Sequence, residues 1–142
     1  MSIVVIGLSH HNSPVGLRER FAFAGARIPA ALAAIRDRGI ADEAVILSTC
    51  NRVEIYAATS LETSRAFDEL KRFISDAQEQ PVPAGVEFYA MAEPDSVHHL
   101  FRVACGLDSM VLGETEILGQ LKDAYEAALK HRHKEPRGRR TR

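Results

Sequence analysis

One cysteine stands in a polar turn between two apolar runs, in the stretch ILSTCNRVEIYA of residues 46–57. A cysteine acts as a nucleophile through its thiolate, and a nearby cation stabilises that anion. Arg52, two residues after Cys50, is a candidate for the cation. The same pattern also fits an ordinary cysteine in a half-exposed loop, so spacing alone leaves both interpretations of Cys50 open.

Histidine pairs are the second group that could do chemistry. His98 and His99 are adjacent, as are His10 and His11, and two neighbours on a regular element cannot both face one site. The two cysteines lie far apart and no segment has the spacing of zinc ligands, so we expect no metal. One histidine of the 98–99 pair, turned toward a cleft, suits proton transfer near neutral pH. Two solvated histidines are the alternative.

A helix is expected over residues 94–107, because Pro94 suits a first helical turn. Its apolar positions are Val97, Leu100, Phe101, Ala104 and Leu107. This assignment puts both histidines on the opposite face, together with Arg102. Cys105 lies in the same apolar segment and is expected to be a buried packing residue, as free cysteine often is.

Residues 106–120, GLDSMVLGETEILGQ, combine glycines with polar side chains. Glycine allows close approach of backbones, and Thr or Glu suits the start of a helix. The segment is either a well-capped turn between helices or the lip of a polar pocket. Its polar members are Asp108, Ser109, Glu114, Thr115, Glu116 and Gln120.

Hydrophobic periodicity predicts the elements that hold these residues. Strands are expected at 3–8, 44–47, 53–58 and 86–91, a short helical turn within 15–23, and helices at 29–40 and 61–78. The order βαββαβ predicts an α+β fold, a ferredoxin-like antiparallel sheet of four strands with helices on one face. Two C-terminal helices, at 94–107 and 114–131, are expected to follow the sheet.

Composition fits one domain over residues 1–130 and a basic, flexible tail over 131–142. The tail holds six Lys or Arg and one Glu, whereas the whole chain of 142 residues has net charge −1, so the body is not a basic nucleic-acid surface. A content of 46% apolar residues supports a packed core. We expect no membrane span and no secretory signal, and with two cysteines a reducing, cytoplasmic location.

Three blocks of the sequence resemble the N-terminal catalytic domain of glutamyl-tRNA reductase. They are GLSHHNSPVGLRE at 7–19, LSTCNRVEIYA at 47–57, and HLFRVACGLDSMVLGETEILGQLKDAY at 99–125. The resemblance implies that Cys50 attacks the ester of glutamyl-tRNA(Glu) and retains glutamate as a thioester. NADPH then reduces the thioester to glutamate-1-semialdehyde, a precursor in tetrapyrrole (porphyrin and heme) biosynthesis.

The resemblance also implies residue roles. His99 matches a histidine important for activity, and Arg52 is positioned to make a forked contact with the substrate carboxylate. The residues matching the family's substrate pocket are Thr49, Asn51, Arg52, Ser109, Glu114, Thr115, Glu116 and Gln120. At Glu116 the family more often has Gln, so the contact made by that residue is open.

The sequence contains no G-x-G-x-x-G and no phosphate loop, so the family's NADPH-binding domain and dimerisation helix are expected to be absent from this chain. A fragment, a truncated frame and a free-standing domain all remain open. Full-length family members are homodimers, and the next enzyme, glutamate-1-semialdehyde aminomutase, is an expected partner. The isolated chain is expected to act only as an esterase. The alternative is a module that binds glutamyl-tRNA or the reductase without redox chemistry.

Overall fold

The computed structural model describes residues 1–83 and 85–105. Its sheet has four strands in the order β2-β3-β1-β4, and all neighbours are antiparallel. The strands are β1 (Ser2–Ser9), β2 (Glu43–Ser48), β3 (Arg52–Thr59) and β4 (Tyr89–Met91). The described helices are α1 (Val15–Phe21), α2 (Ile28–Asp37), α3 (Thr63–Gln78) and α4 (Asp95–Ala104), with a 3-10 turn, η1 (Gly25–Arg27), before α2.

The predicted α+β class and the βαββαβ order are confirmed, and most differences concern the ends of elements. The strand expected over 86–91 begins only at Tyr89, and the helix expected over 29–40 ends at Asp37. Gly39 follows α2 with φ 73°, a left-handed conformation that suits glycine and stops the helix. The helix expected over 114–131, the boundary at residue 130 and the tail lie outside the described residues.

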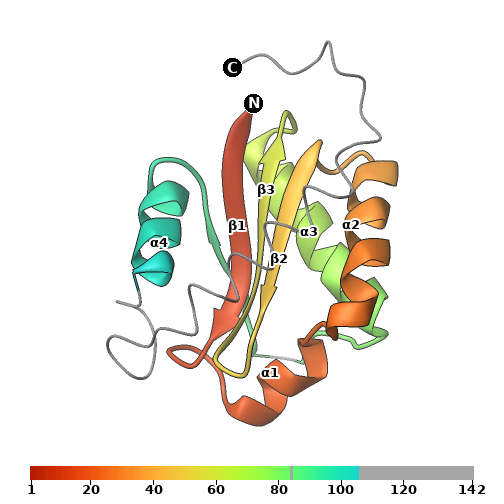
Figure 1. Ribbon diagram of the computed structural model, residues 1–142, viewed down its shortest axis with the longest axis vertical. Coiled ribbons are helices and arrows are strands. Elements are labelled where there is room, and N and C mark those ends of the chain that lie inside the picture. Colours follow the sequence, from red (N-terminus) through yellow and green to blue (C-terminus); the bar gives the residue numbers. More distant parts are fainter. Residues whose placement is uncertain (84, 106–142) are drawn as a thin grey trace.

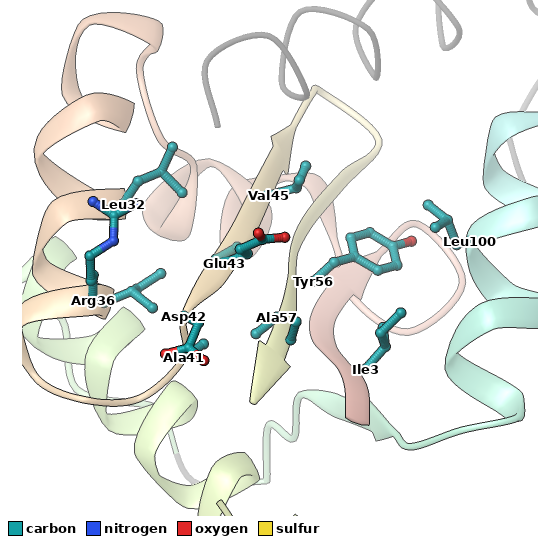
Figure 2. Close-up of a pocket in the computed structure, with 13 residues that line it drawn as sticks. Ile3, Leu32, Arg36, Ala41, Asp42, Glu43, Val45, Tyr56, Ala57 and Leu100 are labelled. Atoms are coloured by element: carbon teal, nitrogen blue, oxygen red, sulfur yellow. The ribbon is translucent and has the colours of Figure 1, made fainter. Parts of the chain in front are cut away.

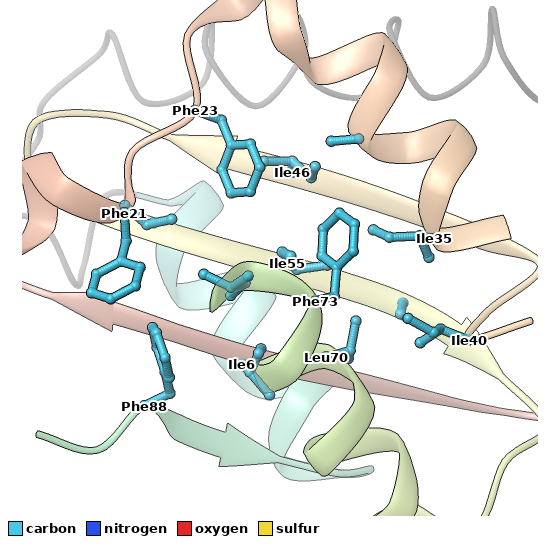
Figure 3. Packing of buried hydrophobic residues seen from close by; sticks show 14 of the residues in the cluster. Ile6, Phe21, Phe23, Ile35, Ile40, Ile46, Ile55, Leu70, Phe73 and Phe88 are labelled. Carbon is cyan, nitrogen blue, oxygen red and sulfur yellow. The ribbon is translucent and has the colours of Figure 1, made fainter. Parts of the chain in front are cut away.

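The apolar core lies between one face of the sheet and the helices α2 and α3 (Figure 3). Alternate residues of β1 and β3 point into it, because successive side chains of a strand face opposite sides. Phe21 meets Phe88 edge to face with ring centroids 5.4 Å apart. Phe23 and Phe73 stack with centroids 6.5 Å apart, so aromatic contacts join the loop before α2 to α3.

Helix α4 lies on the opposite face of the sheet from α2 and α3 (Figure 1). Ser96 ties the start of α4 to β1, since its hydroxyl donates to the Ile3 carbonyl at 2.7 Å. Val103 packs with Leu47 of β2 near the other end of the helix. The face between α4 and the sheet carries Arg52, Glu54 and Tyr56, alternate residues of β3 that bear polar groups. No helix in the described part of the chain is both long and apolar enough to cross a bilayer.

Candidate active site

The turn between β2 and β3 presents the Cys50 side chain to solvent. Thr49 shapes this turn: its hydroxyl accepts from the backbone N–H groups of Asn51 at 3.0 Å and Arg52 at 3.2 Å. The Thr49 N–H in turn donates to the Arg52 carbonyl at 2.8 Å. A side-chain oxygen that satisfies two backbone amides fixes a turn locally. The thiol is therefore exposed but held on an ordered backbone.

A second layer of contacts comes from the segment after β1. The His10 N–H donates to the Asn51 carbonyl at 3.0 Å. Arg18 of α1, 6% exposed, donates from Nε to the Cys50 carbonyl at 3.1 Å and from a terminal nitrogen to the Ser13 carbonyl. The sequence analysis did not identify Arg18, although it lies in the first block of resemblance. A buried guanidinium that binds backbone carbonyl groups has no characteristic residue spacing by which the sequence would reveal it.

A buried carboxylate lies two residues further along β3. Glu54 accepts from Arg52 Nη1 at 3.0 Å, from the Tyr89 hydroxyl at 2.5 Å and from the Tyr56 hydroxyl at 2.7 Å. His99 Nε2 lies 2.5 Å from the same carboxylate. The side chains of Arg52 and Glu54 are 1% and 0% exposed. We call these five residues the Glu54 cluster.

Gly7 makes the space that Glu54 occupies. It stands directly opposite Glu54 in the β1–β3 ladder. A Cβ on Gly7 would lie 2.5 Å from the Val53 carbonyl oxygen and 2.8 Å from Glu54 Cγ, closer than real contacts allow. The bare backbone of Gly7 therefore lets the carboxylate sit against the central strand.

Electrostatics keep Glu54 ionised. Burial alone would raise the pKa of Glu54, but the His99 hydrogen bond, the charges of Arg52 and His99, and the Tyr89 hydrogen bond outweigh it, so the pKa lies below its ordinary value. Burial, followed by the charge and hydrogen bond of Glu54, raises the pKa of Tyr56. Tyr56 thus stays a hydroxyl donor to an acceptor that is always charged near neutral pH.

His99 faces inward from α4, whereas His98 is exposed. The prediction that both histidines lie on the outer face with Arg102 is wrong. The buried residues of α4 are Ser96, His99 and Val103, while Phe101 is 61% exposed. The helix turns polar residues inward because the sheet face beneath it carries Glu54, and a buried carboxylate needs donors more than it needs apolar neighbours.

Cys105 is not the buried packing residue that the sequence predicted. It is exposed, at the C-cap of α4, rather than buried in the core. Its N–H donates to the Phe101 carbonyl at 2.9 Å, so Cys105 lies one turn beyond a residue that is itself exposed. The error follows from the reversed assignment of the inner and outer faces of α4.

Five predicted site residues lie near one end of the sheet: Thr49, Cys50 and Asn51 in the β2–β3 turn, Arg52 at the start of β3, and His99 on the inner face of α4. Arg52, expected to hold the substrate carboxylate, is already paired with Glu54. Any substrate contact with Arg52 must therefore share a guanidinium that Glu54 already holds. The remaining predicted pocket residues, Ser109, Glu114, Thr115, Glu116 and Gln120, lie outside the described residues.

Two hollows adjoin this region. One is lined by Ser9, His11, Asn12, Tyr89, Met91, Asp95, His99 and Arg102, so the His99 ring borders an open cleft between α4, β4 and the loop after β1. The other follows β2, with Leu32 and Arg36 of α2 on one side and Tyr56 and Leu100 on the other (Figure 2). Only Tyr56 of the Glu54 cluster lines the second hollow. Within residues 1–83 and 85–105, no group of three His, Cys, Asp or Glu could hold a metal.

Residues 6–137 match the family described as glutamyl-tRNA(Glu) reductase, N-terminal domain. A glutamyl-tRNA reductase of Stenotrophomonas maltophilia is 48% identical over 132 residues, which are 92% of this chain and 29% of that protein. One of Neisseria gonorrhoeae is 44% identical over 129 residues, 90% of this chain and 30% of that protein.

The solved structure of glutamyl-tRNA reductase from Methanopyrus kandleri superposes with a TM-score of 0.73 at 34% identity, covering 91% of this chain and 28% of that one. The chain therefore spans less than a third of the length of each of these relatives. The matched range includes the Cys50 turn and all five members of the Glu54 cluster. By sequence and by fold, the chain belongs to the family of glutamyl-tRNA reductase N-terminal domains.

Proposed function

We propose that this chain performs the acyl-transfer step of glutamyl-tRNA reductase, with Cys50 as the nucleophile. The observation that carries the proposal is an exposed thiol on a hydrogen-bonded turn, two residues from an arginine that a buried carboxylate links to His99. An exposed cysteine without a function needs no such ordered turn. The family supports glutamyl-tRNA(Glu) as the substrate, because the relatives bear that name.

The reaction proposed is the transfer of a glutamyl group from an oxygen ester to a thiol. The Cys50 thiolate attacks the ester carbonyl carbon of glutamyl-tRNA(Glu), a C–S bond forms and the C–O bond to the terminal ribose breaks. The proton that leaves the thiol ends on the departing ribose hydroxyl. His99 is the group that we assign to carry this proton, since it borders a cleft at the same end of the sheet.

Selection of glutamate is assigned to Arg52 and to the polar residues of the 106–120 segment. A guanidinium can hold a carboxylate through two parallel hydrogen bonds, which favours an acidic amino acid. In the described residues one terminal nitrogen of Arg52 binds Glu54. The proposal therefore requires that the substrate share the guanidinium with Glu54, with Ser109, Glu114, Thr115, Glu116 and Gln120 completing the pocket.

The described residues do not fit NADPH. A dinucleotide site needs a glycine-rich turn that joins a strand to a helix, and the sequence has no G-x-G-x-x-G. Here β1 belongs to an antiparallel sheet and is followed by the polar loop that leads to Pro14. We therefore derive no hydride step for this chain. Four further parts of the proposal rest on family membership alone. They are reduction by NADPH, a homodimeric state, a cytoplasmic location and contact with the aminomutase.

Without a hydride donor, water is the remaining acceptor for the thioester. We therefore expect the chain to release free glutamate and uncharged tRNA from glutamyl-tRNA at a rate that added NADPH does not change. The test follows glutamate and semialdehyde with and without NADPH. The Cys50→Ser protein is the negative control, and Cys105→Ala is a matched control because Cys105 is also exposed.

Three outcomes separate the possibilities. Glutamate release that depends on Cys50 and not on Cys105 supports the proposal. Semialdehyde formed by this chain alone would show that a cofactor site has been missed. Binding of glutamyl-tRNA without ester cleavage would favour the alternative, a binding module.

A further inference from the structure

We propose that Glu54 is the positioning residue of this site, and that it joins the substrate-binding arginine to the proton-transfer histidine through one carboxylate oxygen. Glu54 Oε2 receives Arg52 Nη1 at 3.0 Å and lies 2.5 Å from His99 Nε2. This inference rests on the proposed function, because Arg52 and His99 take their roles from it. Its structural half can be tested on the protein without substrate.

The position of Glu54 is set by the strand and not by a flexible loop. Arg52, Glu54 and Tyr56 are alternate residues of β3, so they share the sheet face beneath α4. Strand β3 lies between β1 and β2, paired along both edges. Gly7 stands opposite Glu54 and leaves space for it, because a Cβ at that position would lie 2.8 Å from Glu54 Cγ. A carboxylate in such a setting holds its partners in one geometry.

The contact with Glu54 determines which ring nitrogen of His99 is left to accept a proton. Because Glu54 is ionised, it can only accept, so the facing Nε2 of His99 must carry a proton. The neutral ring then has its lone pair on Nδ1, which has no hydrogen-bond partner within the described part of the chain. Since the His99 ring borders the cleft, Nδ1 is the atom through which it exchanges protons with a substrate.

The same carboxylate balances the charge of Arg52. A guanidinium that is 1% exposed is costly without a counter-ion, and Glu54 supplies one within hydrogen-bond distance. The Tyr89 and Tyr56 hydroxyls complete the set of donors at 2.5 and 2.7 Å. His99 and Arg52 therefore share one anchor, and moving Glu54 displaces both.

The tautomer of His99 is the direct test. In ¹⁵N-labelled protein, two-bond ¹H–¹⁵N correlation spectra identify the protonated nitrogen of each neutral histidine, and His99→Asn assigns the signals. The expected result is neutral His99 with the proton on Nε2 and the lone pair on Nδ1. A neutral His99 that carries its proton on Nδ1 would overturn the proposal. This readout needs no activity, so it stands even if the proposed function fails.

The functional half is tested by single-turnover loading of labelled glutamate onto the chain. Glu54→Gln keeps the size of the side chain and removes its charge. We expect loading to slow by at least about 10-fold, up to the roughly 100- to 10,000-fold carried by an acid–base group itself. Glu69→Gln is the matched control, because Glu69 pairs with Arg72 of the same helix, α3, away from the Glu54 cluster, and the variant should load at the parent rate.

A purely structural role is distinguished by combining variants. If Glu54 acts partly through His99, Glu54→Gln should slow loading by a smaller factor in the His99→Asn protein than in the parent, because the part carried through His99 is already lost. Multiplied effects in the double variant, or loading by Glu54→Gln at the parent rate, would refute the functional half. If Glu54→Gln does not fold, the His99 tautomer in the parent protein still tests whether Glu54 positions His99. If the parent protein forms no thioester while His99 shows the expected tautomer, the proposed function fails and the positioning role of Glu54 survives.

Discussion

Removing the charge of Glu54 should destabilise the folded chain strongly. In Glu54→Gln the guanidinium of Arg52, 1% exposed, keeps its charge and loses the Glu54 carboxylate, its buried ion-pair partner at 3.0 Å. Breaking a buried ion pair on one side costs about 3–5 kcal/mol, because an uncompensated charge remains in a low-dielectric interior. Replacing Arg52 by Met as well removes that charge, so the double variant should regain part of the lost stability.

The same change should alter the dependence of stability on acid. The pKa of Glu54 is lower in the folded protein than in the unfolded chain, so ionised Glu54 stabilises the fold above its unfolded pKa. That stabilisation is lost as pH falls through the folded pKa. The parent protein should therefore lose more unfolding free energy between neutral pH and acid than Glu54→Gln does.

Urea unfolding followed by circular dichroism, at neutral pH and at several acidic values, measures both effects. The account predicts that Glu54→Gln has a much lower unfolding free energy than the parent at neutral pH and that the double variant regains part of it. It also predicts that the unfolding free energy of Glu54→Gln falls less steeply toward acidic pH. A Glu54→Gln protein within about 1 kcal/mol of the parent would refute the reasoning, since one-sided loss of a buried ion pair costs more than that.

Three further predictions follow from the contacts. Gly7→Ala should lower the unfolding free energy by about 1–3 kcal/mol, because the added Cβ would lie 2.5 Å from a backbone carbonyl oxygen. Gly16→Ala is the control, since a Cβ there has no atom within 4 Å and should not lower the unfolding free energy. Equal urea midpoints for the two variants would contradict this prediction. Arg52→Lys should load labelled glutamate poorly, because an ammonium cannot form a fork, and loading at the parent rate would exclude that contact. His99→Asn should slow single-turnover loading by on the order of 100- to 10,000-fold, and exposed His98→Asn should not; equal losses would remove the assignment of His99.

Sequence patterning predicted the sheet well because its signals are local. Apolar runs rich in β-branched residues indicated β1, β2 and β3, and the apolar face formed by Ala66, Phe67, Leu70, Phe73 and Ile74 indicated α3. The order of these elements was enough to indicate the antiparallel topology. Strand β4 was predicted too long, because only three of its residues pair with β1.

The inner face of α4 could not be predicted from the sequence of α4. Its apolar residues favoured one face, but the helix lies over a sheet surface that carries Glu54, so Ser96 and His99 turn inward. Glu54 itself escaped notice because an acidic residue within a strand is usually solvent-exposed. Tyr89 reaches Glu54 because β1 pairs with both β3 and β4, and His99 reaches it because α4 lies over these strands.

The resemblance supplied what spacing could not. Residue spacing did not decide whether Cys50 is a nucleophile or an ordinary loop residue. It also did not show which of His98 and His99 faces the site. The structure adds the ordered turn around Cys50 and the burial of His99, while the roles that the family implies for both residues stay predictions. The predicted pocket residues from Ser109 to Gln120 stay predictions, because they lie outside the described residues.

Mass spectrometry of the intact protein after brief incubation with glutamyl-tRNA tests the central claim most directly. The account predicts that one glutamyl group is added, that hydroxylamine removes it, and that it maps to the peptide containing Cys50. The Cys105→Ala protein should acquire the same group and the Cys50→Ser protein should not. A glutamyl adduct on the Cys50→Ser protein, or ester cleavage by that protein at the parent rate, would contradict the account.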